Sequence, residues 1–174
     1  MQIPERLTNF RAYSGLDSQE YLGLSTVELP AFEAMTETIS GAGIAGEYAS
    51  PTPGHFGSQM AKFSWRTPTE KMLLLMAPVQ QTIVAYGAMQ LQDPMLGALV
   101  SKQLRVEVRG QVKHHSLGKL EPGKIMAAEV DIECAVIRVD IDGKRVIELD
   151  KFNMIFRVNG VDYLAETRRA MGGV

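Results

Sequence analysis

Two long runs of alternating apolar and charged residues constrain the fold more than any other feature of this sequence. In QLRVEVRGQVK, residues 103–113, one side of an extended chain carries Leu104, Val106, Val108 and Val112, and the other carries Arg105, Glu107, Arg109, Gln111 and Lys113. In KIMAAEVDIECAVIRVDI, residues 124–141, the apolar side alternates with Glu129, Asp131 and Glu133. Each run predicts a strand with one buried and one wet face, and the turn-rich LGKLEPG between them predicts a hairpin.

The second run changes phase near its middle. Around Ala135-Val136-Ile137 the apolar set shifts to Ile137, Val139 and Ile141, as happens at a β-bulge or where a strand crosses between sheets. The sequence therefore predicts one long strand that serves two sheets. Asp142-Gly143, between IRVDI and KRVIELD, predicts a type I′ hairpin, and Asn159-Gly160 predicts a second turn.

Two segments carry helix signals. In TPTEKMLLLMAP, residues 67–78, we expect Thr67 to cap, Pro68 to begin the helix, Glu70 to complete a capping box and Pro78 to stop it. Residues 72–76 are apolar all round, which predicts burial. A short C-terminal helix is expected over residues 162–172, with Asp162 as its cap and two arginines near its C-terminal end.

Three further runs predict strands: residues 27–39, residues 56–66 and QTIVAYGAMQL, residues 81–91. The predicted fold class is therefore mainly β, with one internal helix and a short C-terminal helix.

Length and composition predict one soluble domain, residues 1–174. A chain of 174 residues can bury one good core, and no run of about 18 apolar residues is present to span a bilayer. The N-terminus lacks a signal-peptide pattern and the single Cys134 cannot form an intrachain disulfide, which favours synthesis and assembly in a cytoplasm. A net charge of -2 disfavours tight binding to nucleic acid.

The string GAGIAG, residues 41–46, matches the dinucleotide-binding pattern G-x-G-x-x-G. That pattern needs a helix opening at the glycines and an acidic residue about 20 positions later. Here EYASPTPGHFG follows, and its prolines and glycines forbid a continuing helix. The glycines therefore predict one end of an extended hairpin loop, residues 41–57, which we expect to contact a neighbouring molecule.

No catalytic, cofactor or metal site is predicted. Adjacent His114 and His115 point to opposite faces of a strand, and Cys134 falls on an apolar face, where a thiol acts as a small hydrophobe. The carboxylates of Glu129, Asp131 and Glu133 form a row on a strand and not a metal cage. No G-x-S-x-G motif is present, so the sequence does not indicate an enzyme.

The C-terminal run DGKRVIELDKFNMIFRVNGVDYLAETRRAMG resembles the major tail tube protein of contractile-tailed phages, and also the tube proteins of R-type bacteriocins. Shared features are D-G-K/R, an E-x-D, N-G-V-D, a leucine and a terminal helix. The order of elements is similar too: an N-terminal arm, residues 1–25, a VELPAFE strand, a glycine loop entered at Glu37, a helix near residue 70 and an R-G-Q-V-K strand end.

The resemblance implies a β-sandwich or barrel protomer with a long inter-ring hairpin loop. Six protomers would form a ring, and stacked rings would form the inner tube of a contractile tail, through which DNA passes after the sheath contracts. Its partners would be further copies, the sheath, baseplate and tail terminator proteins, and its place would be the virion tail. Inter-ring contacts would involve Gly41, Gly43, Gly46, Pro51, Pro53 and Gly54.

The resemblance also implies that the wet strand faces line the tube. Lumen-facing residues would be Arg105, Glu107, Arg109, Lys113, Glu129, Asp131 and Glu133, three basic and four acidic groups with a net charge of -1 per protomer. Such a wall would not hold a passing polyanion. One alternative is the tube of a headless contractile bacteriocin or related injection system. A small β-barrel oligonucleotide-binding module is another, but it would need a basic, aromatic face that these strands lack.

Overall fold

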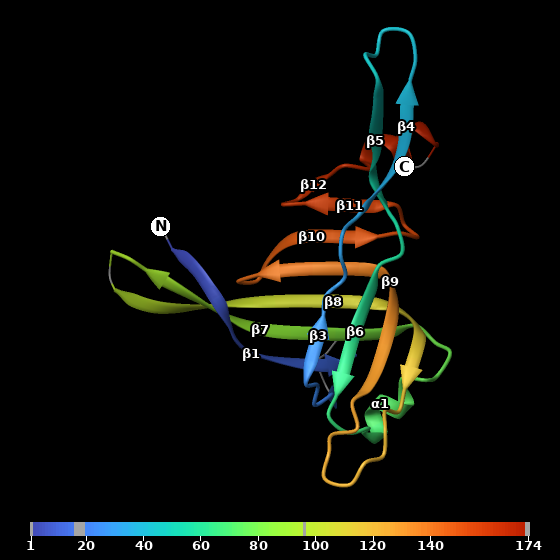
Figure 1. The fold of residues 1–174 in the computed structure, drawn as a ribbon. Helices are drawn as coiled ribbons and strands as arrows, with labels where there is room; N and C mark the ends of the chain where they lie inside the picture. Colours follow the sequence, from blue (N-terminus) through green and yellow to red (C-terminus); the bar gives the residue numbers. More distant parts are fainter. Residues whose placement is uncertain (1, 16–19, 96, 173–174) are drawn as a thin grey trace.

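The computed structural model describes residues 2–15, 20–95 and 97–172, and is mainly β with two short helices, which confirms the predicted class. Figure 1 shows the arrangement. The elements are β1 (Ile3–Ser14), β2 (Glu20–Tyr21), β3 (Thr26–Glu28), β4 (Ala34–Ser40), β5 (Glu47–Phe56), β6 (Met60–Trp65), α1 (Glu70–Leu74), β7 (Gln81–Asp93), β8 (Ala98–Ser116), β9 (Ala128–Ile141), β10 (Lys144–Asp150), β11 (Ile155–Val158), β12 (Val161–Asp162) and α2 (Ala165–Ala170). Neither described helix is long and apolar enough to cross a bilayer.

Ten strands form one antiparallel sheet in the order β12-β11-β10-β9-β8-β7-β1-β2, with β6 and β3 branching from β9. The remaining two strands, β4 and β5, form a separate hairpin that projects beyond β12 (Figure 1). In this view β6 and β3 cross the long strands of the sheet, and side chains of β6 pack against β8 and β9 in one hydrophobic core.

Strand β9 makes two pairings along the same edge, but β6 and β10 belong to one ten-stranded sheet. The prediction that this strand serves two sheets is therefore wrong, and the β-bulge predicted as the alternative is confirmed. Its first half pairs with β6, from Ala128 to Glu133, and its second half pairs with β10, from Val136 to Ile141. A bulge separates the halves, because Arg109 of β8 lies opposite Val136 and the next residue, Gly110, lies opposite Cys134. Only glycine fits at position 110, since an added Cβ would overlap the carbonyl oxygen of Glu133.

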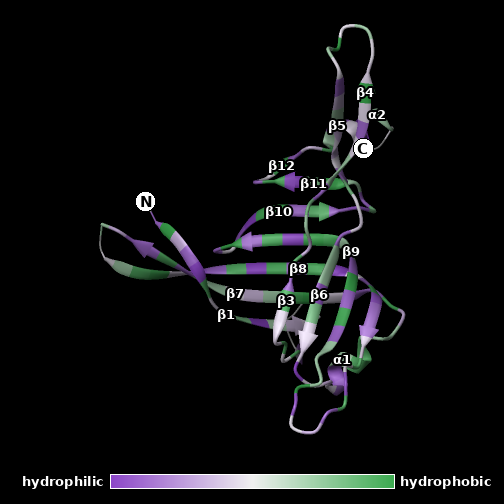
Figure 2. Cartoon of the chain, viewed as in Figure 1, coloured by the Kyte–Doolittle hydropathy of each residue, from purple (hydrophilic) through white to green (hydrophobic). Residues whose placement is uncertain are grey.

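The core lies between the sheet layers. It contains Phe63 and Trp65 of β6, packed with Val106 and Val108 of β8 and Ile137 of β9, all at most 4% exposed. The indole N–H of Trp65 donates to the carbonyl of Leu22 at 2.7 Å, so its polar atom is satisfied inside the core. Hydrophobic and hydrophilic bands alternate along β8 and β9 in Figure 2, so the face of these strands that lies opposite the core is polar.

The two predicted turns are confirmed. Asp142 and Gly143 have φ of 49° and 77°, and Asn159 and Gly160 have φ of 50° and 88°. Two successive residues with positive φ match the right-handed twist of the flanking strands, which is why Asp-Gly and Asn-Gly suit these positions.

Both helices are shorter than predicted. The internal helix is capped by Thr69 and not Thr67, because the Thr69 hydroxyl accepts from the N–H of Met72 at 3.2 Å. Burial of the whole apolar run is also wrong: Met72 and Leu75 are buried, whereas Leu73, Leu74 and Met76 are 43%, 64% and 59% exposed. One side of a single helical turn can face the core, and the other side remains at the surface.

The C-terminal helix begins after Leu164, and Asp162, its expected cap, lies in β12. The Asp162 carboxylate still orders the helix start, because it accepts from the N–H of Leu164 at 3.1 Å.

The segment expected as an N-terminal arm is largely a strand. Residues 3–14 form β1 and pair with β7 from Gln92 back to Ile83, with two irregularities in register. Most of β1 is exposed, so its sequence lacks the apolar alternation that indicates a strand. The run 27–39, expected as one strand, is divided into β3 and β4.

Candidate functional site

The seven residues predicted to line a channel lie on one surface, the polar face of β8 and β9. On β8, Arg105 and Glu107 lie opposite Asp140 and Arg138 of β9. Beyond the bulge, Gln111 lies opposite Glu133 and His114 lies opposite Asp131, so Glu129, Asp131 and Glu133 continue the same face. Lys113 is the extra residue of a second bulge, and its charge acts on Glu133. We call the polar surface of β8, β9, β10 and β11 the charged face.

Glu107 is the centre of an ion-pair cluster on the charged face. Its side chain is 3% exposed, and it accepts from Arg105 at 2.8 Å, Arg109 at 2.6 Å and Arg138 at 3.1 Å. Burial alone would raise the pKa of Glu107, but the hydrogen bonds from Arg105 and Arg109 outweigh it and the pKa is lowered. The carboxylate therefore stays ionised, and it holds three guanidinium groups on this face of the sheet.

The cluster continues across the neighbouring strands. Asp140 accepts from Arg105 at 2.9 Å and from Arg145, and Glu148 accepts from Arg138 at 3.0 Å and from Arg157 at 3.1 Å. Burial would raise the pKa of Asp140, yet its hydrogen bonds with the two arginines lower it. Ion pairs thus join four adjacent strands, β8 to β11, in addition to the backbone ladder.

Asp162 carries these ion pairs to the C-terminal helix. Its carboxylate lies 2.7 Å from the Arg168 guanidinium, which lowers the pKa of Asp162, and 3.5 Å from that of Arg157. Arg168 also donates to the carbonyl of Met154 at 2.6 Å. Helix α2 has no buried residue of its own, so these contacts and Leu164 before it hold its position.

A second, smaller cluster surrounds Glu133. The Ser58 hydroxyl donates to its carboxylate at 2.5 Å and the N–H of Gln59 donates at 3.1 Å, with Lys151 4.0 Å away. Burial would raise the pKa of Glu133, but these hydrogen bonds lower it. Among the described residues no group of three or more His, Cys, Asp and Glu side chains could hold a metal ion.

Sequence reasoning missed six charged residues of this face. They are Arg138, Asp140, Arg145, Glu148, Asp150 and Arg157. The change of phase at residues 135–137 was the available signal, because it turns Arg138 and Asp140 outward beside Arg105 and Glu107. Three of the six are basic and three are acidic, so adding them to the predicted set leaves its net charge unchanged.

The predicted inter-ring loop is a β-hairpin with a shorter turn than expected. Gly41, Gly43 and Gly46 lie in the turn between β4 and β5, with φ of 150°, 91° and 114°. The expectation that Pro51, Pro53 and Gly54 belong to a loop is wrong, because they lie in β5. Proline is tolerated there since β5 pairs only with β4 among the described strands, and its other edge needs no N–H donor.

Gly54 joins the base of this hairpin to the C-terminal region. Its φ is +69°, and an added Cβ would lie 2.8 Å from the side chain of buried Leu164. Phe56, at the end of β5, also packs edge-to-face on Phe156 of β11, with ring centroids 5.1 Å apart. The hairpin is therefore anchored at its base on the same strands that carry the charged face.

The residues considered for catalysis or metal binding are Cys134, His114 and His115. The Cys134 side chain is 1% exposed, and burial raises the pKa of its thiol to about 11. The thiol therefore stays protonated at neutral pH and does not act as a nucleophile. His115 lies 3.3 Å from the carbonyl of Met72, whereas His114 is exposed on the charged face. The two rings point to opposite sides, as predicted.

The chain matches the family described as phage tail tube protein FII over residues 4–172. It is 28% identical to the tail tube protein of Escherichia phage P2 over 179 residues, which covers 99% of both chains. The sheath/tube terminator of an extracellular contractile injection system, PVC, in the extended state is similar in structure, with TM-score 0.56, 11% identity and coverage of 79% of this chain and 96% of that chain. The sheath-tube complex of that system aligns with TM-score 0.45 at 12% identity over 79% of this chain and 90% of that chain.

The family match spans nearly the whole chain and the matched relative covers it almost completely. A mainly β protomer with an open sheet and a projecting hairpin suits a protein whose function is assembly. The chain belongs to the phage tail tube protein FII family, and its role is that of a structural tail tube protein of a contractile tail.

Proposed function

We propose that residues 1–174 form one tube domain, that six copies form a ring, and that stacked rings form the inner tube. The observation that carries this proposal is the open sheet. One side of β1 pairs with β7, and on the other side only Tyr13 and Ser14, at the end of the strand, pair with β2. The edge from Ile3 to Arg11 therefore has no partner among the described strands. Unpaired edges are templates for another strand, and a ring removes them by joining neighbours.

The charged face is proposed to line the channel. Its arginines are already occupied by carboxylates of the same chain, and affinity for a polyanion grows with the number of phosphates that free cations neutralise. The residues assigned to the charged face are six basic and seven acidic side chains per protomer, a net charge of -1, so such a wall is wetted without retaining DNA. The chain would act as a conduit and not as an enzyme, and needs no cofactor.

The proposed partners are further copies of this chain, a surrounding sheath, a baseplate from which the tube grows and a tail terminator. DNA would pass through the lumen transiently, after the sheath contracts. The proposed location is the virion tail, assembled in the cytoplasm of the host bacterium without stable membrane association.

Electron microscopy of the purified protein over a concentration series tests this assembly. We expect six-fold rings or hollow tubes with a constant axial repeat. Monomers at every concentration, in the presence of a preformed baseplate as a template, would contradict the proposal.

A second measurement tests the channel wall. Tubes of the wild-type protein should retain no DNA after a wash at physiological salt, whereas tubes carrying Glu129→Lys and Asp131→Lys should retain DNA in a salt-dependent manner. Lys119→Glu, on the loop after β8, is the matched surface control. Equal DNA retention by wild-type and doubly substituted tubes would show that this face does not line the channel.

A further inference from the structure

We propose that the outer edge of β1 is built to prevent two free copies from pairing β1 to β1, which keeps this edge for the different strand that a neighbour in a ring presents. The inference rests on the proposed ring and concerns the selectivity of its joining edge. It is carried by three local features of β1: two bulges, a proline, and backbone groups that are already occupied.

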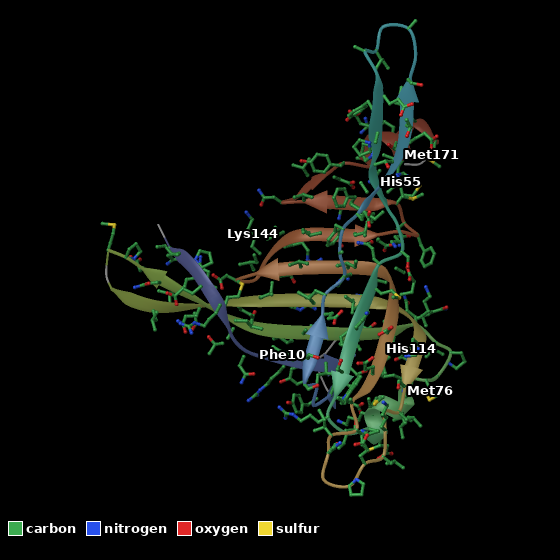
Figure 3. All side chains as sticks on the ribbon, viewed as in Figure 1. Phe10, His55, Met76, His114, Lys144 and Met171 are labelled. Atoms are coloured by element: carbon green, nitrogen blue, oxygen red, sulfur yellow. The ribbon has the colours of Figure 1, made fainter. Side chains whose placement is uncertain are left out.

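Strand β1 gives the sheet a long edge that is open to unwanted pairing. It has 12 residues, of which β2 covers only Tyr13 and Ser14, whereas β12, at the other end of the strand order, has two residues. Phe10, labelled in Figure 3, lies on β1 at this margin of the sheet. Ile3 and Leu7 are 44% and 49% exposed, so apolar side chains lie beside the free backbone. An exposed edge of this kind is a template for an identical edge.

Pairing of two β1 edges would oppose the formation of a ring. Two identical edges meet about a two-fold axis, and a dimer of that kind is closed. Each copy in a ring has to join its neighbours through two different surfaces. A β1–β1 dimer would therefore bury the joining edge of both copies at once.

Two bulges interrupt the first half of β1. Glu5 has no partner on β7, because its neighbours Pro4 and Arg6 pair with consecutive residues of that strand, and Thr8 is an extra residue in the same way. The Glu5 carboxylate accepts from the side chain of Gln90 at 2.7 Å, which holds the first bulge against β7. Bulges bend a strand and increase its twist, so two of them close together remove the flat, regular edge that a second β1 would need.

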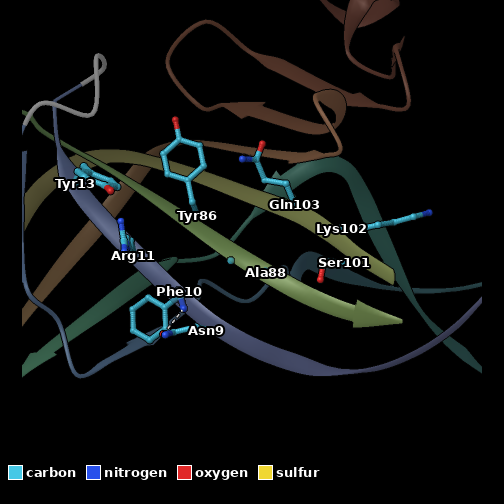
Figure 4. A pocket seen from close by; sticks show the side chains of 10 residues that line it. Asn9, Phe10, Arg11, Tyr13, Tyr86, Ala88, Ser101, Lys102 and Gln103 are labelled. Carbon is cyan, nitrogen blue, oxygen red and sulfur yellow. Dashed lines mark hydrogen bonds between the residues drawn. The ribbon is translucent and has the colours of Figure 1, made fainter. Parts of the chain in front are cut away.

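Several backbone groups on this edge are missing or already occupied. Pro4 has no N–H to offer to another strand. Phe10 donates its N–H to the side-chain oxygen of Asn9 at 2.8 Å, the dashed line in Figure 4. The carbonyl of Ala12 accepts from the N–H of Leu22 at 3.0 Å. Because the groups that point to one side recur at every second residue, Phe10 and Ala12 belong to the same edge, and neither offers a free N–H and C=O together.

These features oppose an identical edge more than a different one. A bulged strand still pairs along its length with a strand of suitable shape, as β1 does with β7. When two copies of β1 pair, both strands carry the bulges and the occupied backbone groups, so the irregularities of the two edges add. The selectivity is therefore directed against self-pairing and leaves β1 able to accept another strand.

A straightened β1 tests the inference. Deletion of Glu5 and Thr8 removes both extra residues and leaves every other residue of β1 opposite its present partner on β7. Pro4→Thr and Asn9→Thr in the same protein restore one N–H and free another. In sedimentation velocity we expect this straightened variant to dimerise with an association constant roughly tenfold or more above that of the wild-type protein, because a regular edge adds several backbone hydrogen bonds. Its yield of rings or tubes should fall.

Glu5→Gln/Thr8→Ser is the matched control, since it changes the same two side chains and keeps both bulges. It should dimerise no more than the wild-type protein. Circular dichroism and the thermal midpoint show whether each variant is folded. If the straightened variant does not fold, deletion of Glu5 with Pro4→Thr removes only the bulge near the start of β1 and should still increase dimerisation.

A single introduced cysteine identifies the paired edge. Leu7→Cys in the straightened variant should link two copies by a disulfide, because a two-fold pair brings equivalent residues of the two strands together near the axis. Neighbours in a ring are joined through different surfaces, so Leu7→Cys in the otherwise wild-type protein should give no link. Native Cys134 is buried and does not interfere. Lys144→Cys in the straightened variant, at the exposed start of β10, is the second control and should give no link.

The outcomes separate this inference from the proposed function. If the wild-type protein forms no rings or tubes, the proposed function fails, whereas dimerisation of the straightened variant still tests the edge. A folded variant with a straightened β1 that dimerises no more than the wild-type protein would overturn the inference, whatever its yield of tubes. A dimer that gives no Leu7→Cys link and no added protection of the β1 amides from hydrogen exchange would overturn it equally.

Discussion

Glu107→Gln should destabilise the protomer more than any other single change on the charged face. One carboxylate, 3% exposed, receives three arginines at 2.6–3.1 Å. The amide keeps one acceptor oxygen and turns an NH2 group toward a guanidinium, so positive charge is left uncompensated. Removing one member of a buried ion pair typically costs about 3–5 kcal/mol. Because the arginines are 19–25% exposed, water screens part of this, and we expect about 3 kcal/mol.

The assay is urea unfolding of the monomer at pH 7, followed by circular dichroism, with a thermal scan beside it. A loss of about 3 kcal/mol corresponds to roughly 6–12 °C for a chain of this length. Glu129→Gln is the matched control: it lies on the same face, is exposed and makes no ion pair with a described residue, so it should change stability by less than about 0.5 kcal/mol. Equal effects of the two substitutions would refute the view that the Glu107 cluster stabilises the fold.

Three further outcomes are expected. In the folded state the pKa values of Glu107 and Asp140 lie below their ordinary values of 4.5 and 3.8. Their contribution to stability is therefore complete above the ordinary pKa values and is lost as the pH falls through the folded-state pKa values. The urea midpoint should decline below about pH 4.5, and it should decline less in Glu107→Gln. Gly54→Ala should cost about 1–3 kcal/mol through positive φ and its clash with Leu164, whereas Gly57→Ala, with open space around it, should be nearly neutral in the same urea titration. Cys134 should react with a thiol reagent at pH 8 only after denaturant is added, and rapid labelling of the native protein would contradict its burial.

The parts of the fold that could be predicted are those whose residues face a core on one side and water on the other. Alternation identified β7, β8 and β9, and the Asp142-Gly143 turn followed from the positive φ that both positions need. Strand β1 was missed because most of it is exposed in one protomer, and β5 was missed because Pro51 and Pro53 normally exclude a strand. Residues that are exposed on both sides, or that include proline, carry no apolar alternation, so their local pattern does not indicate a strand.

The ion pairs could be predicted only in part for a different reason. The sequence places Arg105, Glu107 and Arg109 on one strand face, but the partners Asp140 and Glu148 come from strands whose register depends on bulges. A bulge shifts every later residue to the other face, and one is not fixed by local propensity alone. Which charged side chains form ion pairs therefore depends on the tertiary structure and not on the local sequence.

The position of the β4–β5 hairpin depends on the charged face. Asp162 connects the two, because it accepts from Arg168 and the N–H of Leu164 and lies 3.5 Å from Arg157, which in turn contacts Glu148. Leu164 then fills the space that only glycine leaves free at position 54 of the hairpin. A displacement of β11 relative to β10 would therefore move Leu164 and tilt the hairpin at its base. In a tube whose rings stack through this hairpin, the ion pairs of β10 to β12 would therefore set the position of the contact with the next ring.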